Sequence, residues 1–248
     1  MKPRLFFAVP CYRQVDVFWM TCVMQMHGAL SRAGVPMHLG LKVGDSLVVR
    51  ARNRLVADFL KTECTHLLFI DTDQTFGPTL ALELLETGHD LVGCAVPKKA
   101  VNWGRVAQMA REGCSAEDVH ALSSDVVLNH SHTAGSIDTV SECLPVDAIG
   151  TGVMLVARGV FERMRAAMGE GIRVISDFPD DAGAEYHKYF DDIICPDTRR
   201  DLSEDYTFCR RARKVGIQPY LYWKAVIGHV GSYEYRGNIL SMFQPTKE

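Results

Sequence analysis

The sequence predicts an α/β protein in which helices flank a central, mostly parallel sheet within a single compact domain. Three observations support this prediction. Short apolar runs alternate with segments of helical periodicity over the first 96 residues, as in strand–helix–strand units. Residues 66–70 are continuously apolar, like a strand that is buried on both faces. The chain has 248 residues, 47% hydrophobic and 23% charged, which is enough for one substantial core.

Four strands are expected in the first half of the chain, over residues 5–9, 37–43, 66–70 and 90–96. After the first of them, apolar residues recur at helical spacing, at Val15, Trp19, Cys22, Met26 and Leu30. Gly34 ends this helix. Ser46 is the expected N-cap of a second helix that continues to residue 60. Pro78 and Gly88 bracket a third helix, which completes the alternating order.

The second half is less regular. Its expected elements are a strand over residues 149–157, a helix to about residue 168, a helix from Ser203 to before Gly216, and a strand over residues 220–227. The first of these strands contains Gly150-Thr151-Gly152. Residues 113–142 and 170–200 are rich in polar or acidic side chains, so we expect irregular structure there.

The overall charge excludes one broad class of protein. Lys and Arg total 27 and Asp and Glu total 30, so the formal net charge is −3. A chain so nearly balanced does not bind DNA or an anionic membrane through bulk charge. No apolar run approaches the ~18 residues that span a bilayer, and residues 5–9 are shorter than a signal-peptide core of roughly 7–15 residues. We therefore expect a soluble, cytoplasmic protein that has no contact with a membrane.

The cysteines point to free thiols rather than to disulfides or a zinc site. There are 8 of them, none in a Cys-x-x-Cys pair, and most lie inside apolar segments. Buried thiols of this kind are typical of a reducing compartment.

The sharpest candidate site is the Asp-x-Asp motif Asp71-Thr72-Asp73, directly after the strand over residues 66–70. In open α/β sheets, ligands bind at the carboxyl ends of the strands. Two carboxylates there would suit Mg²⁺ or Mn²⁺, together with the phosphates of a substrate. The alternative is that both aspartates only stabilise a turn. The position after a buried strand favours the metal.

Three other segments have both a structural and a functional interpretation. Glu204 and Asp205 either stabilise a helix N-terminus or provide a general base that faces a cleft. His229, in a glycine-rich segment, is either a packed residue or a metal ligand. The arginines of residues 50–54 are either solvated or partners of a diphosphate.

Together these segments resemble the glycosyltransferases of the GT-A fold, of the small stand-alone type found in bacterial and phage genomes. The matching segments follow the family's order: Pro10-Cys11-Tyr12, Ala51-Arg52-Asn53, Phe69-Ile70-Asp71-Thr72-Asp73, Gly150-Thr151-Gly152, Ser203-Glu204-Asp205-Tyr206 and Gly228-His229. Each motif is weak alone, but the order extends over nearly the whole chain. The resemblance implies a metal-dependent transfer of a hexosyl or pentosyl group from a nucleotide sugar, with a UDP-sugar as the first candidate, to an acceptor hydroxyl.

The resemblance also implies a role for the donor-side residues. Pro10, Cys11 and Tyr12 would line the nucleotide base. Arg52 and Asn53 would lie near the nucleotide or support the loop of Asp71.

The metal would lie in that loop, with Mn²⁺ or Mg²⁺ as the cofactor. Asp71 would approach the ribose or a metal-bound water, with Thr72 beside it in the nucleotide site. Asp73 would bind the metal directly, and His229 would complete the protein ligands. Such a cation neutralises the charge that grows on a departing diphosphate.

On the acceptor side, Asp205 would be the general base, with Glu204 as the competing assignment. A base opposite the leaving group implies inversion at the anomeric carbon. Gly150, Thr151 and Gly152 would let the substrate approach the backbone closely. From their position alone, we add Lys98 and Lys99 as contacts for phosphate or acceptor. Residues 1–100 would thus bind the nucleotide sugar, and residues 101–248 would bind the acceptor and carry the base.

The acceptor stays open between two classes. Some enzymes of this kind glycosylate hydroxymethylated pyrimidines in DNA, and a basic cluster near the proposed base is compatible with a polyanion: Arg199, Arg200, Arg210, Arg211, Arg213 and Lys214. A solvated surface explains the same cluster, and a saccharide or small-molecule hydroxyl is the rival acceptor.

Two other functions remain alternatives: a metal-dependent nucleotidyltransferase, and a binding protein that has lost its chemistry. His130 and His132 form a weaker candidate metal pair. The oligomeric state is not predicted.

Overall fold

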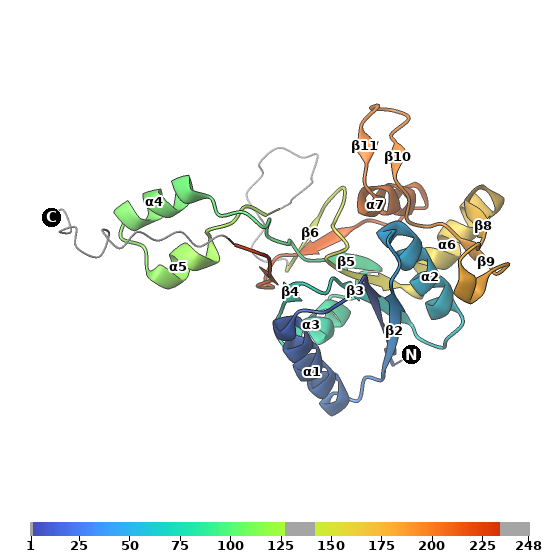
Figure 1. The fold of residues 1–248 in the computed structure, drawn as a ribbon, viewed down its shortest axis with the longest axis horizontal. Helices are drawn as coiled ribbons and strands as arrows, with labels where there is room; N and C mark the ends of the chain where they lie inside the picture. The colour runs from blue at the N-terminus through green and yellow to red at the C-terminus, as the bar shows by residue number, and fades with distance from the viewer. Residues whose placement is uncertain (1, 127–141, 234–248) are drawn as a thin grey trace.

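The computed structural model describes residues 2–126 and 142–233, and its centre is a seven-stranded sheet (Figure 1). In spatial order the strands are β2 (Met37–Val43), β1 (Leu5–Cys11), β3 (His66–Ile70), β7 (Val153–Ala157), β5 (Leu91–Gly93), β12 (Tyr220–Tyr222) and β6 (Cys143–Pro145). Only β7 and β6 run against the common direction. The predicted α/β class with a mostly parallel sheet is therefore confirmed.

Helices cover both faces of this sheet. The α-helices in the described part of the chain are α1 (Val17–Arg32), α2 (Val48–Leu60), α3 (Leu80–Glu86), α4 (Trp103–Arg111), α5 (Ala116–Ala121), α6 (Arg158–Met168) and α7 (Glu204–Lys214). Buried residues of α1 and α3 form one core, and buried residues of α2, α6 and α7 form the other. A single domain results, with the sheet between two helical layers.

The two cores follow from the alternation of side chains along a strand. In β1, Leu5 and Phe7 belong to the core of α1 and α3, whereas Phe6 and Ala8 belong to the core of α2. Because both faces are covered, the central strands carry apolar side chains on both sides. Their polar contacts are therefore confined to the strand ends, where the loops begin.

Three short antiparallel ladders lie outside the main sheet: β4 (Gln74–Thr75) with β13 (Gly228–His229), β8 (Arg173–Ile175) with β9 (Glu185–His187), and β10 (Ile193–Ile194) with β11 (Asp201–Leu202). Two 3₁₀ turns, Gly169–Ile172 and Pro179–Asp181, complete the elements. The ladder of β4 and β13 matters most for the site, because it pairs His229 with Gln74.

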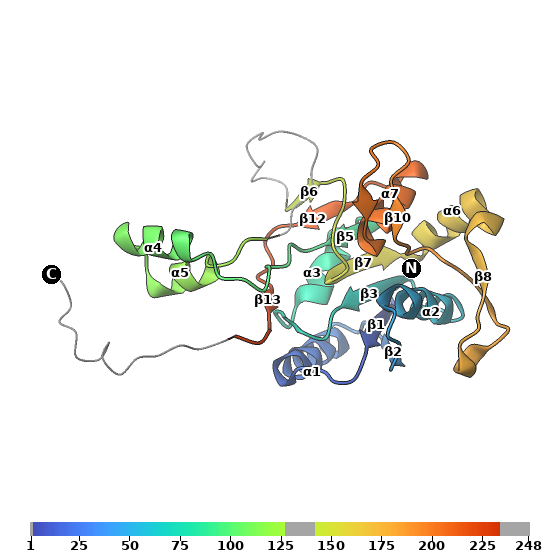
Figure 2. The ribbon, with the colours of Figure 1, turned by 45° about the horizontal axis from the view of Figure 1, so that its top comes forward.

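Helices α4 and α5 form a hairpin that extends away from the sheet, at the left of Figures 1 and 2. Backbone bonds close its base, from Lys98 N to Asp125 O (2.8 Å) and from Asn102 N to Ser123 O (2.7 Å). Helix α5 lies inside the segment 113–142 that we expected to be irregular. His130 and His132 lie outside the described residues.

Three predicted boundaries were wrong. Helix α2 begins at Val48 with Leu47 as its N-cap, because the carboxylate of Asp45, and not Ser46, accepts the N–H of Leu47. Gly150-Thr151-Gly152 precedes β7 instead of lying in it, since the ladder with β3 ends where Ile70 meets Val153. The last predicted strand is reduced to Tyr220–Tyr222.

The eight cysteines, all within the described residues, carry thiol side chains, and all but Cys22 and Cys114 are buried. This agrees with the prediction of free thiols. Within residues 2–126 and 142–233, no helix has the length and apolar character needed to cross a membrane.

Candidate active site

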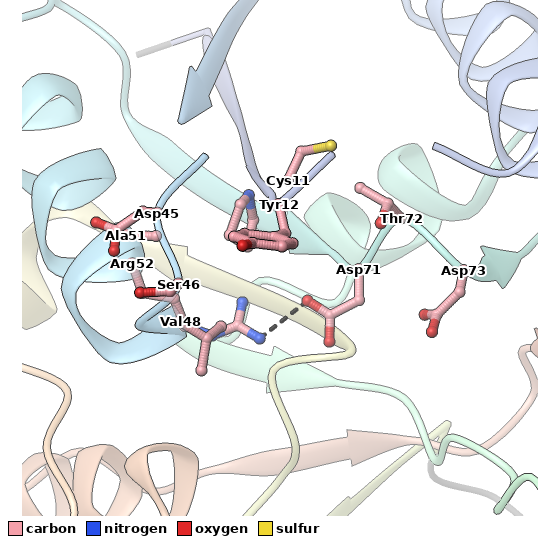
Figure 3. A pocket seen from close by; sticks show the side chains of 11 residues that line it. Cys11, Tyr12, Asp45, Ser46, Val48, Ala51, Arg52, Asp71, Thr72 and Asp73 are labelled. Atoms are coloured by element: carbon pink, nitrogen blue, oxygen red, sulfur yellow. Dashed lines mark hydrogen bonds and ion pairs between the residues drawn. The ribbon is translucent and has the colours of Figure 1, made fainter. Parts of the chain in front are cut away.

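The loops after β1 and β3 and the start of α2 enclose a cavity of about 340 Å³ (Figure 3). Its lining residues are Pro10, Cys11, Tyr12, Asp45, Ser46, Val48, Ala51, Arg52, Asp71, Thr72 and Asp73. Strands β1 and β3 are parallel neighbours, so their carboxyl ends meet at one edge of the sheet. The structure therefore brings the predicted loop of residues 10–12 and the Asp-x-Asp motif to one cavity.

Backbone hydrogen bonds hold the two loops in place. The N–H of Gly44 donates to the carbonyl oxygens of Cys11 and Tyr12, and the N–H of Asp16 donates to the carbonyl of Thr72. Gly44 has a φ of 76°, a conformation that side chains disfavour. The cavity is thus part of the fold, because main-chain contacts fix its walls.

Arg52 joins the two halves of the site. Its Nη2 donates to Asp71 Oδ1 at 2.9 Å, as Figure 3 shows, and its Nε lies 3.4 Å from Glu204 Oε1. The guanidinium lies over the ring of Phe69 and its side chain is 3% exposed. Burial raises the pKa of Glu204, although the positive charge of Arg52 works in the other direction. Arg52 therefore supports the loop of Asp71, one of its two expected roles.

Asn53, also expected near the nucleotide, is buried and does not line this cavity. Its side chain donates to the carbonyl oxygens of Val49 and Phe190 and accepts the N–H of Phe190. Asn53 fastens α2 to the segment before α7.

The neighbouring arginines of α2 are both paired with carboxylates. Arg50 donates twice to the carboxylate of Asp45, and Arg54 pairs with both Asp45 and Asp181. The side chain of Asp45 is fully buried and that of Arg54 is 3% exposed. The solvated alternative is therefore wrong for Arg54, whereas Arg50 is paired with Asp45 and stays 27% exposed.

A second charged cluster lies at Asp73. Its Oδ2 is 2.5 Å from Lys99 Nζ and 3.4 Å from His229 Nε2, and its Oδ1 accepts a hydrogen bond from Gln74. Burial raises the pKa of Asp73, but Lys99 and His229 outweigh it and leave the pKa below its usual value. The carboxylate is therefore ionised and faces cationic or nitrogen groups.

His229 is oriented by the backbone. Its Nδ1 is 2.7 Å from the carbonyl oxygen of Pro97, and a carbonyl only accepts, so we assign the ring proton to Nδ1. Nε2 is then the ring nitrogen that faces Asp73, at 3.4 Å from its Oδ2. A second hydrogen bond of this kind is a regular feature of histidines that bind metals.

Asp73 and His229 suit a shared divalent cation better than the full predicted set does. Ligand bonds of about 2.1 Å allow two ligand atoms to be 3.4 Å apart on one ion. Asp71 is turned toward Arg52 and away from Asp73 (Figure 3). Accordingly, no group of three or more His, Cys, Asp and Glu side chains suited to a metal occurs among the described residues.

The acids of α7 lie against the turn before β7. Thr151 Oγ1 is 3.5 Å from Glu204 Oε1, and a Cβ on Gly150 would lie 3.5 Å from Asp205 Oδ2. Asp205 Oδ1 accepts from Ser203 Oγ and from the N–H of Tyr206. The structure therefore places both candidate bases beside Gly150 and Thr151.

Gly152 has a packing role that the sequence did not reveal. A Cβ at this position would come within 2.9 Å of Val96 Cγ2. The glycine is required by this close contact within the protein.

Three of the six residues of the basic cluster before and within α7 form ion pairs. Arg210 pairs with Asp197, Arg211 with Asp191, and Arg213 with Asp147. Arg211 also donates to two backbone carbonyl groups, those of residues 188 and 189. The sequence shows these acids but not which arginine each one pairs with.

Sequence reasoning missed Asp45 as a residue of the cavity wall. One signal was available: Asp45 follows Gly44 and precedes Arg50 at the start of a helix, an arrangement that favours an acid at the N-terminus.

Comparison with known proteins assigns no family. No protein-family model and no curated protein matches the chain. Among solved structures, the chain is similar to GalNAc-T7 bound to UDP, GalNAc and Mn²⁺, with a TM-score of 0.45 and 9% identity over 99% of this chain and 46% of that one. The chain thus spans less than half the length of GalNAc-T7.

Two further solved structures are similar. A glycosyltransferase involved in glycosylation of the major capsid of PBCV-1 gives a TM-score of 0.32 and 11% identity over 68% of each chain. The inositol-1-phosphate CTP transferase from T. maritima gives 0.35 and 10% identity over 93% of this chain and 89% of that one. These likenesses are too remote to assign an activity.

Proposed function

We propose that the chain is a metal-dependent glycosyltransferase that moves a sugar from a nucleotide sugar to an acceptor hydroxyl, with inversion. One observation supports this most directly. Asp73 and His229, far apart in sequence, face each other across 3.4 Å beside a cavity at the carboxyl ends of parallel strands. That combination offers a place for a nucleotide next to a place for the cation that its diphosphate needs.

The cavity suits the nucleoside part of the donor. Its volume of about 340 Å³ falls within the range of small-molecule sites, roughly 300–1,000 Å³. Tyr12 offers a ring against which a base can stack, and Pro10 and Val48 add apolar surface. UDP is the nucleotide we would test first.

The diphosphate would lie toward Asp73 and His229. A bound Mn²⁺ or Mg²⁺ would supply a positive charge to the leaving diphosphate. Gln74 orients Asp73, and the carbonyl of Pro97 orients His229. Both side chains therefore have a fixed orientation in which they could bind the cation. Arg52 holds Asp71 away from the cation, in a position to contact the ribose instead.

Asp205 is the proposed general base, and Glu204 is the competing candidate. Arg52 already contacts one carboxylate oxygen of Glu204, whereas Oδ2 of Asp205 faces Gly150. The base must come within about 2.6–3.2 Å of the acceptor hydroxyl to take its proton. Inversion follows from this assignment.

Two acceptor classes remain in the proposal. DNA that carries a 5-hydroxymethylpyrimidine is the first, and a saccharide or small-molecule hydroxyl is the second. The ion pairs of Arg210, Arg211 and Arg213 weaken the argument from charge for a polyanion. Both classes therefore belong in the test.

The test is release of nucleoside diphosphate. The protein is incubated with Mn²⁺ and a panel of sugar nucleotides, alone, with hydroxymethylated DNA, and with a panel of saccharides. We expect release from one donor that is stimulated by one acceptor class and abolished by a chelator. Absence of release under every condition would overturn the proposal, and turnover of nucleoside triphosphates would indicate a nucleotidyltransferase.

A further inference from the structure

We propose that Lys99 is a built-in counter-cation of Asp73, which a divalent metal and a nucleoside diphosphate displace together. The inference rests on the proposed function and concerns how its metal site is filled. Lys99 would then make the binding of metal and diphosphate cooperative.

The competition is for a single oxygen atom. Lys99 Nζ contacts Asp73 Oδ2 at 2.5 Å, and the same Oδ2 faces His229 Nε2 at 3.4 Å. Asp73 Oδ1 is already bonded to Gln74. The oxygen that faces His229, and that a cation shared with His229 would use, is therefore the one that Lys99 contacts.

The backbone around Lys99 determines where its side chain lies. A Cβ on Gly231 would come within 2.9 Å of Lys99 Cδ and 3.4 Å of its Cγ, so the glycine makes room for the lysine stem. The N–H of Val230 donates to the carbonyl of Asp73 at 2.8 Å. The same short segment after β13 thus holds the backbone of Asp73 and makes room for the stem of its lysine partner.

The ion pair is also one that can open. The side chains of Lys99 and Asp73 are 43% and 37% exposed, so water screens their attraction and can replace either partner. Lysine has a flexible stem and a compact charge. Its ammonium can leave Asp73 for a phosphate oxygen without any change in the backbone.

Cooperativity follows from this exchange. In the free protein, a metal must displace an ammonium group and then tolerate its positive charge nearby. When a diphosphate is present, that ammonium gains an anionic partner, and the metal gains further oxygen ligands. Each ligand therefore raises the affinity for the other by the same factor.

The test compares Lys99→Met with the wild type. Methionine keeps an unbranched stem and removes the charge. The affinity for Mn²⁺ is measured by electron paramagnetic resonance and calorimetry, with and without UDP. We expect Lys99→Met to bind Mn²⁺ on the order of tenfold more tightly in the absence of UDP, because the like charge beside Asp73 has gone. We also expect UDP to enhance that affinity less than it does in the wild type.

Lys224→Met is the matched control. Lys224 is 44% exposed and forms a 2.5 Å ion pair with Glu142, away from the cavity. This control should leave the Mn²⁺ affinity and its dependence on UDP unchanged. A second variant, Gly231→Ala, keeps the lysine charge but crowds its stem, and should shift the Mn²⁺ affinity in the same direction by a smaller factor.

The outcomes separate this inference from the proposed function. If the wild type binds Mn²⁺ and UDP together but Lys99→Met has the same Mn²⁺ affinity as the wild type, the counter-cation role is wrong and the proposed function stands. If neither protein binds Mn²⁺ even with UDP, the metal site of the proposed function fails as well. Unfolding in urea confirms that each variant is folded.

Discussion

The two walls of the cavity carry charge in different ways. On the α2 wall, the side chains of Arg52, Arg54 and Asp45 are no more than 3% exposed, and each has a carboxylate or guanidinium partner. On the opposite wall, Asp73 is 37% exposed, and His229, which faces Asp73 from beside the cavity, is 20% exposed. The first set is enclosed by protein, and the second set is reached by water.

This difference separates residues that hold the site from residues that exchange partners. Removing one member of a buried ion pair leaves the other unpaired, which destabilises a protein by several kcal/mol. An exposed pair contributes only about 0–1 kcal/mol, so it can be replaced by a ligand at little cost. The α2 wall therefore acts as a scaffold, and the wall of Asp73 is where we propose that a cation and a diphosphate bind.

The largest expected effect comes from Arg52→Met. This change leaves Asp71 and Glu204 without their shared guanidinium, and we expect a loss of about 3 kcal/mol in the free energy of unfolding. Urea unfolding at pH 7 measures it. Arg105→Met is the control, because Arg105 pairs with Asp125 at about half exposure, and it should cost less than about 1 kcal/mol. Equal losses of unfolding free energy in Arg52→Met and Arg105→Met would contradict the distinction between the two walls.

Asp45→Asn should have the next largest effect, and that effect should depend on pH. Burial raises the pKa of Asp45, but Arg50, the N–H of Leu47 and Arg54 outweigh it and leave the pKa lowered. A lowered folded-state pKa means that the carboxylate stabilises the protein above its ordinary pKa, and that this stability is lost as the pH falls through the lowered value.

We therefore expect Asp45→Asn to cost about 2 kcal/mol at pH 7 and progressively less as the pH falls below the ordinary pKa of an aspartate. Urea unfolding between pH 7 and pH 3 checks both parts. Asp58→Asn is the control, since Asp58 is 39% exposed beside Lys42 and Lys61, and its effect should be small at every pH. A cost for Asp45→Asn that stays constant down to pH 3 would contradict the account.

Asp205→Asn and Glu204→Gln separate the two candidate bases, with modest effects on stability. Asp205 has hydrogen bonds only within the first turn of α7, so we expect Asp205→Asn to keep donor binding and to lose transfer by at least 100-fold. Glu204→Gln should mainly weaken the contact with Arg52. Product formation and donor affinity are measured side by side. If Glu204→Gln loses transfer and Asp205→Asn does not, Glu204 is the general base.

Local patterns predicted much of the fold and of the cavity. The runs at residues 5–9, 37–43 and 66–70 are strands, and the segments around Tyr12 and Asp73 meet because parallel strands end at one edge. Long-range pairing was beyond such patterns. From the sequence alone, Arg54 is expected to be a surface charge. In the structure it pairs with Asp181, which lies in a loop much later in the chain.

The same limit explains the error at Ser46 and the packing of Gly152, which the sequence did not reveal. Whether a glycine admits a substrate or a neighbouring side chain depends on packing, and here the neighbour is Val96. Whether Ser46 or Asp45 satisfies a helix N-terminus depends on where the chain turns at Gly44. Both choices are decided by tertiary geometry and not by residue type.

The most direct test of the account is the binding of UDP to wild type and to Asp73→Asn, by calorimetry in the presence of Mn²⁺. Asp73 is a half-exposed carboxylate, so Asp73→Asn should change the free energy of unfolding by less than about 1 kcal/mol. We predict that the wild type binds UDP only with Mn²⁺ and that the folded Asp73→Asn protein loses at least tenfold in that affinity. Equal affinity in the two proteins, or binding that is indifferent to Mn²⁺, would contradict the account.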